Sequence, residues 1–428
     1  MAIVLTTSAM LLAGCSEATS AGSGSGTTST VTSTSCGAGT SVVACTPSGS
    51  MLSPYMTKTA TKATGSPIVI GTINQDSGAA GAFPELTEAD KVAVDFVNSE
   101  LNGIDGHPLE LLTCNTNGDP ELSQSCAQEM VTKHVMAVVG GIDIWGTGIQ
   151  TLTNNGIPYV GGVPVSTESV QSKVSFQFSG GTWGAALGLG EYAIRTLHAR
   201  KIAMIYIDFG PIANSAKLAA SVFERHGAHV TLVSVSAINP DLVTAMNQAA
   251  QSSPDAVIAL TADTGCKPAM LTAKQIGIKV PLMYTGACAA TDILNSLGSA
   301  ANNSIFNVEA DLNRSSPDNV LYHDIVDHYG PKYGYQWQSA GTVSFRSLIN
   351  LYVVMRRLGV DKITPTAIAG MFRSAKDQPS FFGHPYTCNG HQLNGYPAMC
   401  SPQQSLAVYK NGSIKQLTGW IDVGSFAR

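Results

Sequence analysis

The stretch from Pro67 to Glu110, PIVIGTINQDSGAAGAFPELTEADKVAVDFVNSELNGIDGHPLE, decides the fold of this 428-residue chain. Ile68–Ile73 is a short apolar run rich in β-branched residues, which predicts a strand buried on both faces. A loop of small residues follows at Asp76–Gly81, and a helix is expected next, with Pro84 near its first turn. The helix carries one apolar stripe at helical spacing, formed by Leu86, Ala89, Val92, Ala93, Phe96 and Val97. This unit of strand, loop, helix and strand places its loop at the carboxyl end of a strand, where open α/β folds hold their ligands.

The length and composition of the chain favour two globular domains. A single hydrophobic core rarely grows to 428 residues, and a hydrophobic content of 44% is enough for two full cores. Charged residues make up only 12% of the chain, and the net charge is −5. Because Lys and Arg form no cluster, we expect no nucleic-acid partner.

The first residues resemble the export signal of bacterial lipoproteins. An apolar run, Ala2–Leu12, ends in Leu-Ala-Gly-Cys, which is similar to a lipobox with Cys15 as the lipidated residue. The first basic residue is Lys58, so the usual positive segment before the apolar run is absent. Two explanations stay open: the true start lies upstream, or the run is only a hydrophobic tail. With the lipoprotein interpretation, residues 1–14 are the signal peptide and residues 15–66, rich in Ser, Thr and Gly, are a flexible tether.

Nine cysteines leave eight for disulfides if Cys15 carries lipid. Proximity along the chain suggests four local pairs, although eight cysteines allow 105 pairings. The proposed pairs are Cys36/Cys45, Cys114/Cys126, Cys266/Cys288 and Cys388/Cys400. No CxxC motif occurs and no His stands at ligand spacing from a Cys pair, so we expect neither a metal nor a cofactor. Disulfides fit an extracytoplasmic location.

Strand and helix patterns alternate through the rest of the chain and predict an α/β fold with two parallel sheets. Expected strands of the first set follow Ile68–Ile73 at Leu109–Thr113, Ala137–Gly140 and Ile157–Val160. A second set begins near Thr182, and Ile305–Asp311 is a further strand. The tail predicts a hairpin of Leu406–Lys410 and Ile414–Leu417 around an Asn-Gly turn.

The order of these motifs resembles the type I periplasmic binding proteins of the branched-chain amino acid class. These are extracytoplasmic solute receptors of ATP-binding-cassette (ABC) importers. The resemblance rests on IVIG, SGAAG, AVDFVNSELNGIDGHPLEL, AVVGG and IPYVGG in the first half, on IAMIYID-FG, PDAVIAL and QIGIKVPLMYTGA in the middle, and on the SAGTVSFRSLINLYVVMRRLG helix and the VYKNGSIKQL tail. It covers residues Pro67–Leu417.

The resemblance implies two Rossmann-like lobes, joined by three crossovers, that close on a ligand between them. The crossovers are expected near Gln177–Gly181, Phe306–Glu309 and Pro379–His384. One lobe would comprise residues 67–178 and 305–378, and the other residues 179–304 and 379–428. Lipid anchorage to a membrane, a permease partner and a monomeric state are further expectations.

The resemblance also implies that loops at the carboxyl ends of strands line the ligand cleft. These loops are Ser77–Gly81, Ile142–Gly146, Gly162–Pro164, Asp208–Gly210, Ala262–Thr264 and Gly286–Cys288. Relatives that bind amino acids hold the carboxylate with hydroxyls in the second and third loops and the ammonium with an acid in the last. Here Val163-Pro164 supplies no hydroxyl and Ala287-Cys288 no acid, so an amino-acid ligand is poorly supported.

Nine residues of these loops are the candidate ligand contacts. They are Ser77, Gly78, Asp143, Trp145, Gly162, Val163, Phe209, Asp263 and Ala287. Trp145 can stack on a ligand or wedge into the interior of its lobe. Asp143 and Asp263 can accept hydrogen bonds from a ligand, but an Asp after a strand is more often a helix cap. The Ser77–Gly81 loop can present N–H groups to an anion, or its glycines only permit a tight turn.

Three functions are consistent with these features. The first is a solute-binding lipoprotein without catalysis that captures a small polar or amphipathic solute and delivers it to an importer. The second is a sensor that passes lobe closure to a signalling partner. The third, an extracytoplasmic hydrolase, lacks support because no GxSxG, HExxH or P-loop motif occurs.

Overall fold

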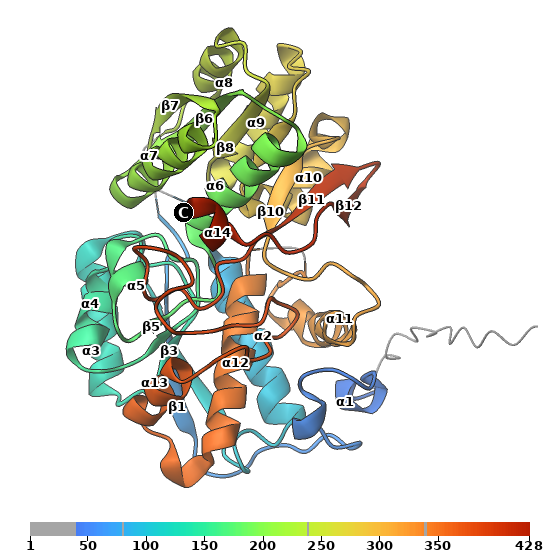
Figure 1. Ribbon diagram of the computed structural model, residues 1–428. Coiled ribbons are helices and arrows are strands. Elements are labelled where there is room, and N and C mark those ends of the chain that lie inside the picture. The colour runs from blue at the N-terminus through green and yellow to red at the C-terminus, as the bar shows by residue number, and fades with distance from the viewer. Residues whose placement is uncertain (1–39, 79–80, 238, 338–339) are drawn as a thin grey trace, which may run out of the picture. The chain divides into compact units, whose positions relative to one another are not determined.

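The computed structural model describes residues 40–78, 81–237, 239–337 and 340–428. Its strands form two sheets, each flanked by helices (Figure 1). The strands are β1 Ile68–Asn74, β2 Leu109–Asn115, β3 Val138–Val139, β4 Tyr159–Val160, β5 Ser175–Phe176, β6 Lys201–Asp208, β7 His229–Ser236, β8 Ala256–Leu260, β9 Leu282–Tyr284, β10 Ile305–Val308, β11 Ser405–Lys410 and β12 Ser413–Gln416. The helices are α1 Val42–Cys45, α2 Pro84–Glu100, α3 Pro120–Thr132, α4 Thr147–Asn154, α5 Thr167–Gln171, α6 Gly181–Glu191, α7 Gly210–Arg225, α8 Leu242–Gln251, α9 Asp263–Gln275, α10 Thr291–Leu297, α11 Pro317–Tyr329, α12 Thr342–Leu358, α13 Pro365–Arg373 and α14 Val423–Ala427.

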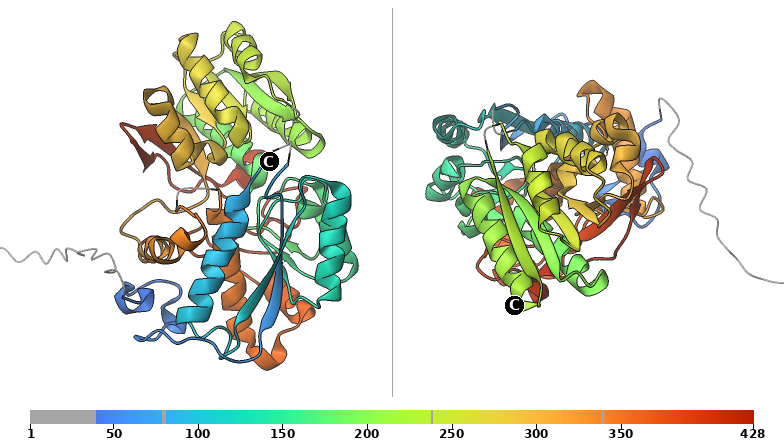
Figure 2. Two further views of the ribbon diagram at one scale, coloured as in Figure 1. Left: turned by 180° about the vertical axis from the view of Figure 1, so that it is seen from behind. Right: turned by 90° about the horizontal axis from the view of Figure 1, so that it is seen from above.

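The first sheet is entirely parallel, in the order β2-β1-β3-β4-β5. Apolar side chains of β1 alternate between its two faces, so Ile70 packs with α2 and α12 whereas Ile73 packs with α3 and α4. Figure 2 (left) shows α2 and α3 on opposite sides of these strands. β1 is therefore buried on both faces, as its continuous apolar run predicts, whereas the edge strand β2 is partly exposed.

The second sheet has the order β12-β11-β10-β9-β8-β6-β7. Its strands from β6 to β10 run parallel, and β11 and β12 add an antiparallel hairpin next to β10. One face packs on α6, α7 and α14, and the other on α8, α9 and α10. Two mostly parallel sheets confirm the predicted α/β fold.

Strand β10 belongs to the second sheet, whereas the predicted division assigned residues 305–378 to the first lobe. Ile305 pairs with Met283 of β9 on one side and with Val408 of β11 on the other. The assignment of residues 305–308 to the first lobe is therefore wrong. The chain passes between the two lobes after β5, after β10 and before β11, so three connections join them. The remaining lobe boundaries stay predictions.

Part of the predicted tether packs against the first lobe. The backbone N–H groups of Val42 and Val43 donate to the two carboxylate oxygens of Glu100, at 3.0 and 2.8 Å, and both valines are buried. Ser50 donates to Asp318 at 2.7 Å, and Thr61 forms a bridge with Leu101. The prediction of a tether extending to residue 66 is therefore wrong for this segment. The predicted signal peptide and Cys15 lie outside the described residues. Within the residues that the structure describes, no helix is both long and apolar enough to cross a membrane.

Three of the four predicted disulfides are present: Cys114–Cys126, Cys266–Cys288 and Cys388–Cys400. Cys36 lies outside the described residues, so its pairing with Cys45 stays a prediction. The Cys114–Cys126 bridge joins the end of β2 to α3. The Cys266–Cys288 bridge joins α9 to the turn after β9, so each of these two bridges fixes a loop at a strand's carboxyl end.

The buried side chain of Arg346, on α12, contacts all three connections between the lobes. Its guanidinium donates to the carbonyl oxygen of Phe178 at 2.9 Å and to that of Glu309. The Glu309 carboxylate lies 3.9 Å from the guanidinium and accepts the Gly180 N–H at 2.7 Å. In the third connection, Gly383 lies so close that an added Cβ would meet Arg346 Cδ at 2.7 Å.

We expect replacement of Arg346 by Met to lower the free energy of unfolding by about 3–5 kcal/mol, because Glu309 would stay buried without its counterion. The side chains of Arg346 and Glu309 are only 2% and 9% exposed. The double variant Arg346→Met/Glu309→Gln should recover part of the loss. Urea unfolding measures both effects.

Arg195→Met is the matched control for this experiment. The Arg195 side chain is 53% exposed in its ion pair with Glu191, so we expect a loss below about 1 kcal/mol. Equal losses in Arg346→Met and Arg195→Met would contradict the proposed role of the buried pair.

Candidate functional site

A cavity of about 620 Å³ lies between the two lobes, and we call it the cleft cavity. Residues of both lobes line it, among them Phe83, Ile142, Ile144, Val163 and Val343 from the first lobe and Phe209, Ile212, Leu260, Ala287 and Ile414 from the second. Most of these side chains are apolar. Concave, largely apolar cavities of this size are typical of small-molecule sites.

Five of the six loops that the resemblance implied contribute to the lining of the cleft cavity. Ile142 and Ile144 come from the loop after β3, and Val163 from the loop after β4. The second lobe contributes Phe209 after β6, Ala262 and Thr264 after β8, and Gly286 and Ala287 after β9. Three of the nine candidate residues, Val163, Phe209 and Ala287, thus line the cavity. Their contact with a ligand stays a prediction.

Two candidate residues of the remaining loop, Ser77 and Gly78, contact their own lobe. Ser77 is exposed, donates to Asn117 at 3.0 Å and accepts from Asn115 at 2.7 Å. Gly78 has a φ of +144°, and an added Cβ would lie 2.6 Å from the carbonyl oxygen of Asn117. A residue with a side chain would therefore be strained at position 78, and glycine permits the tight turn there. Neither residue is among those that line the cleft cavity.

Asp143 and Gly162 have structural roles next to the cavity. Asp143 is buried and accepts the backbone N–H groups of Gly146 and Ile149, at 3.1 and 3.2 Å, at the start of α4. Burial raises the pKa of its carboxyl group, while hydrogen bonds from Ser123 and from these N–H groups oppose the shift. This geometry supports the helix-cap alternative. Gly162 has a φ of +84°, and an added Cβ would lie 2.3 Å from the Gly141 oxygen.

Trp145 and Phe209, which the sequence placed in two different loops, meet across the lobes. Their ring centroids are 5.1 Å apart, with the rings nearly perpendicular. Trp145 Nε1 donates to the carbonyl oxygen of Gly118 at 2.8 Å, which fixes the indole on its loop, although the residue is 45% exposed. Edge-to-face aromatic pairs contribute about 0.5–1.5 kcal/mol beyond their burial. The pair therefore favours the arrangement in which the two lobes are in contact.

We expect Trp145→Ala to shift the lobes toward a more open arrangement, because the only aromatic partner of Phe209 among the described residues is lost. Small-angle X-ray scattering would show a larger radius of gyration than in the wild type. Leu122→Ala is the matched control, because Leu122 is equally exposed, at 45%, but lies on α3. An unchanged radius of gyration in Trp145→Ala would refute the role of this pair.

Asp263 lies at a rim where acidic side chains of the two lobes face one another. It is the first residue of α9, and its Oδ1 atom is buried and has no hydrogen-bond partner among the residues that the structure describes. An added Cβ on Gly81 of the first lobe would lie 3.8 Å from that atom. Burial raises the pKa of Glu85, at the start of α2, to about 7, and the negative charges of Asp263, Glu88 and Asp292 add to the shift.

The raised pKa predicts a pH-dependent loss of stability that Glu85→Gln abolishes. The folded protein binds the proton of Glu85 more tightly than the unfolded chain, whose carboxyl group has a pKa near 4.5. The loss of folding free energy that the ionised Glu85 causes is therefore absent below pH 4.5 and complete above about pH 7. Between pH 5 and pH 7.5, the free energy of unfolding of Glu85→Gln, measured with urea, should rise relative to that of the wild type by on the order of 2–3 kcal/mol. Glu129→Gln, an exposed site on α3, is the control, and a gain that does not depend on pH would contradict the assignment.

A cluster that the sequence analysis missed lines another part of the cleft cavity. It consists of Arg314, His323 and Trp337 of the first lobe, with Tyr322 and Phe382 beside them. A signal was present, because Arg314 follows the predicted second crossover by only five residues. Within the described residues, no group of three or more His, Cys, Asp or Glu side chains is placed to hold a metal ion.

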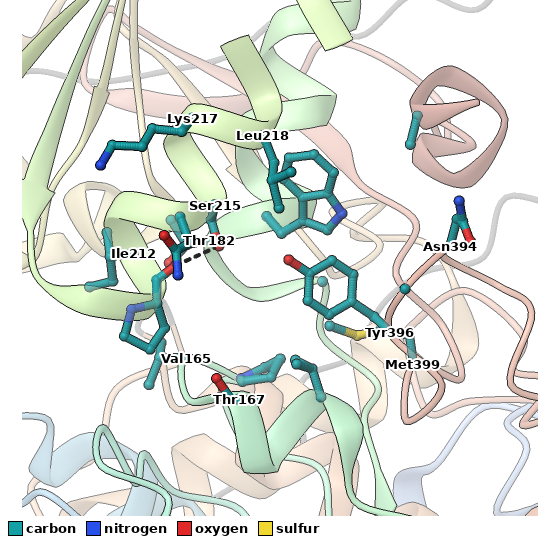
Figure 3. Close-up of a pocket in the computed structure, with 18 of the residues that line it drawn as sticks. Val165, Thr167, Thr182, Ile212, Ser215, Lys217, Leu218, Asn394, Tyr396 and Met399 are labelled. Carbon is teal, nitrogen blue, oxygen red and sulfur yellow. Dashed lines mark hydrogen bonds between the residues drawn. The ribbon is translucent and has the colours of Figure 1, made fainter. Parts of the chain in front are cut away.

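A second cavity of about 650 Å³ adjoins the first, and we call it the hinge-side cavity (Figure 3). The two cavities share Val165, Thr182 and Ile212, which form a wall between them. Figure 3 shows the Tyr396 hydroxyl directed toward Ser215, whose own hydroxyl donates to the carbonyl oxygen of Pro211 at 3.0 Å. The loops at the carboxyl ends of the strands converge on the cleft cavity, which is therefore the candidate solute site.

The chain matches one protein family and is similar in fold to several solved structures. Residues 67–399 match the model of a family described as periplasmic binding protein. No curated protein matches the chain. Among solved structures, a leucine-binding protein from Thermotoga maritima is 15% identical with a TM-score of 0.65, over 82% of this chain and 98% of that one.

Two further similar structures are of proteins associated with other solutes. A solute-binding protein of an ABC transporter from Rhodopseudomonas palustris, in complex with 3,4-dihydroxybenzoic acid, is 16% identical with a TM-score of 0.68, over 84% of this chain and 98% of that one. A fatty acid ABC transporter substrate-binding protein from Thermomonospora curvata is 15% identical with a TM-score of 0.70, over 86% and 96%. At these identities the likeness shows the fold.

Proposed function

Because this chain belongs to the periplasmic binding protein family, we propose that it captures a small, largely apolar solute between its lobes and delivers it to an ABC importer. The family consists of solute-binding proteins, which work by lobe closure rather than by catalysis. The observation that carries the proposal is the composition of the cleft cavity, whose walls from both lobes are mainly aliphatic and aromatic.

The third and the last of the six loops do not suit the charged groups of an amino acid. Val163 lines the cavity from the third loop, and Ala287 lines it from the last. Both side chains are apolar, so neither offers a hydroxyl or a carboxylate to a charged ligand. A charged group buried without a partner carries a large desolvation cost. An apolar or aromatic solute, in contrast, gains roughly 25 cal/mol for each Å² of apolar surface that it loses to the cavity.

The structural relatives support a broad range of solutes for this fold. The three similar structures are of proteins described as binding leucine, 3,4-dihydroxybenzoic acid and fatty acid. One frame thus serves apolar, aromatic and polar solutes, and the lining selects among them. For this chain, the lining favours the apolar and aromatic end of that range.

We extend the proposal to location and partners. Three disulfides fit an oxidising, extracytoplasmic compartment. We propose that Cys15 is lipidated and anchors the protein as a monomer near its permease. Mass spectrometry of the N-terminal peptide of the native protein tests the anchor, and an unmodified Cys15 would exclude it.

A thermal-shift screen followed by calorimetry tests the function. We expect hydrophobic and amphipathic solutes to raise the melting temperature by several degrees at 100 times their Kd, where binding adds about 2.7 kcal/mol. Amino acids without large apolar side chains should give no shift. No shift with any apolar, aromatic or polar solute would refute solute capture.

The variant Val163→Asp tests whether the cleft cavity is the site. An uncompensated carboxylate in the apolar lining should weaken binding of an apolar hit about tenfold or more. Leu122→Asp is the matched control, since it introduces the same charge on exposed α3 and should bind like the wild type. Equal affinity in Val163→Asp would place the solute elsewhere.

A further inference from the structure

One end of the cleft cavity carries a fixed positive charge. Arg314 lies between β10 and α11, His323 lies on α11, and Trp337 precedes α12. The turn of the β11–β12 hairpin, at Gly412 and Ser413 of the second lobe, lines the same cavity. Figure 1 shows α11 and this hairpin on the side of the molecule away from α7, whose Ile212 also lines the cavity. The cavity therefore extends from an apolar part near α7 to the cluster around Arg314.

The positive charge in this cluster belongs to Arg314 alone. Its guanidinium carbon lies 5.0 Å from the centroid of the Trp337 ring, and its Nη1 atom is 2.9 Å from His323 Nε2. A guanidinium only donates hydrogen bonds, so this imidazole nitrogen accepts and His323 is neutral. Burial, together with the charge of Arg314, lowers the pKa of His323 to about 4.

Arg314 has no protein counterion among the described residues. The ion pairs there are Arg195–Glu191, Lys332–Asp95, Arg346–Glu309 and Arg356–Asp105. Asp311 also lines the cavity, but its carboxylate accepts the backbone N–H of Asn313, at 2.8 Å. The stacked guanidinium therefore keeps most of its five N–H donors for a ligand, in the fork geometry that matches a carboxylate.

Two acidic residues, Glu309 and Asp311, line the cavity, and the charge of Glu309 is already compensated. Glu309 lines the cavity, but its carboxylate faces the buried Arg346 and accepts from Gly180 and Gln404. Most of the remaining lining is apolar, with Phe83, Ile144 and Phe209 among it, and uncharged hydroxyl and amide side chains such as Thr264, Thr285 and Asn319 make up much of the rest.

We propose that the solute is an amphipathic monocarboxylate, with its apolar body between the lobes and its carboxylate paired with Arg314. This inference rests on the proposed function and narrows it to one ligand class. The stacking on Trp337 and the hydrogen bond to neutral His323 orient the guanidinium before the solute arrives, so little freedom is lost on binding. Because Arg314 is exposed, a neutral end group would leave its guanidinium hydrated and without a counterion, and a cationic end group would be repelled by it.

Two ligand series with one changed end group test the proposal. The first comprises 4-phenylbutanoate, 4-phenylbutan-1-ol and 4-phenylbutylamine, and the second comprises decanoate, decan-1-ol and decylamine. Calorimetry with the wild type should show tighter binding of the acid than of the alcohol and the amine in at least one series. In Arg314→Gln, the acid should bind about tenfold more weakly while the alcohol is unaffected. Lys133→Gln removes an exposed charge on the first lobe outside the cavity and should behave like the wild type.

The outcomes separate the inference from the proposed function. Equal affinity for acid and alcohol, or an acid preference that survives in Arg314→Gln, would overturn the inference. If none of the six probes binds but the broader screen finds another solute, the inference is wrong and solute capture stands. If nothing in the broader screen binds either, the proposed function itself fails.

Discussion

The buried pair of Arg346 and Glu309 is the constraint on which the arrangement of the two lobes depends. Two charges removed from water require compensating partners, and these come from all three connections between the lobes, although Arg346 Nε has no hydrogen-bond partner among the described residues. Gln404 continues the network, since it donates to Glu309 at 2.5 Å and accepts from Asn307 at 2.9 Å. Asn307 in turn accepts the N–H of Gly286, in a loop that lines the cleft cavity. The hinge and the floor of the candidate site are thus one hydrogen-bonded unit.

Local patterns predicted most of the fold because each buried strand and each amphipathic helix shows its own periodicity. Local patterns gave wrong predictions where contacts between segments distant in the sequence determine the structure. The membership of Ile305–Val308 in the second sheet depends on pairing with β9 on one side and with β11, which follows a hundred residues later, on the other. The packing of Val42 depends on Glu100, which no feature of a Ser- and Thr-rich segment could reveal. The disulfides were predictable because each joins cysteines that are close in sequence.

The residues of the candidate site also fall into a group that the sequence predicted and a group that it did not. Val163, Phe209 and Ala287 were accessible to sequence reasoning because loops at the carboxyl ends of parallel strands converge. Asp143 illustrates the limit of this rule, since its oxygens are used by the start of α4. The cluster of Arg314, His323 and Trp337 was not predicted, because these residues converge only through the folding of α11 and its flanking segments.

The bridge between Cys266 and Cys288 has a consequence for the thermodynamics of solute capture. It covalently joins the first turn of α9, just after the loop that follows β8, to the turn after β9, and residues of that loop and of that turn line the cleft cavity. Loops held in this way have little conformational entropy left to lose when a solute arrives. The entropy lost by the protein on capture then comes mainly from the relative motion of the two lobes. Affinity in such a receptor is governed by how far the empty protein already favours closure, so substitutions far from the solute can tune it.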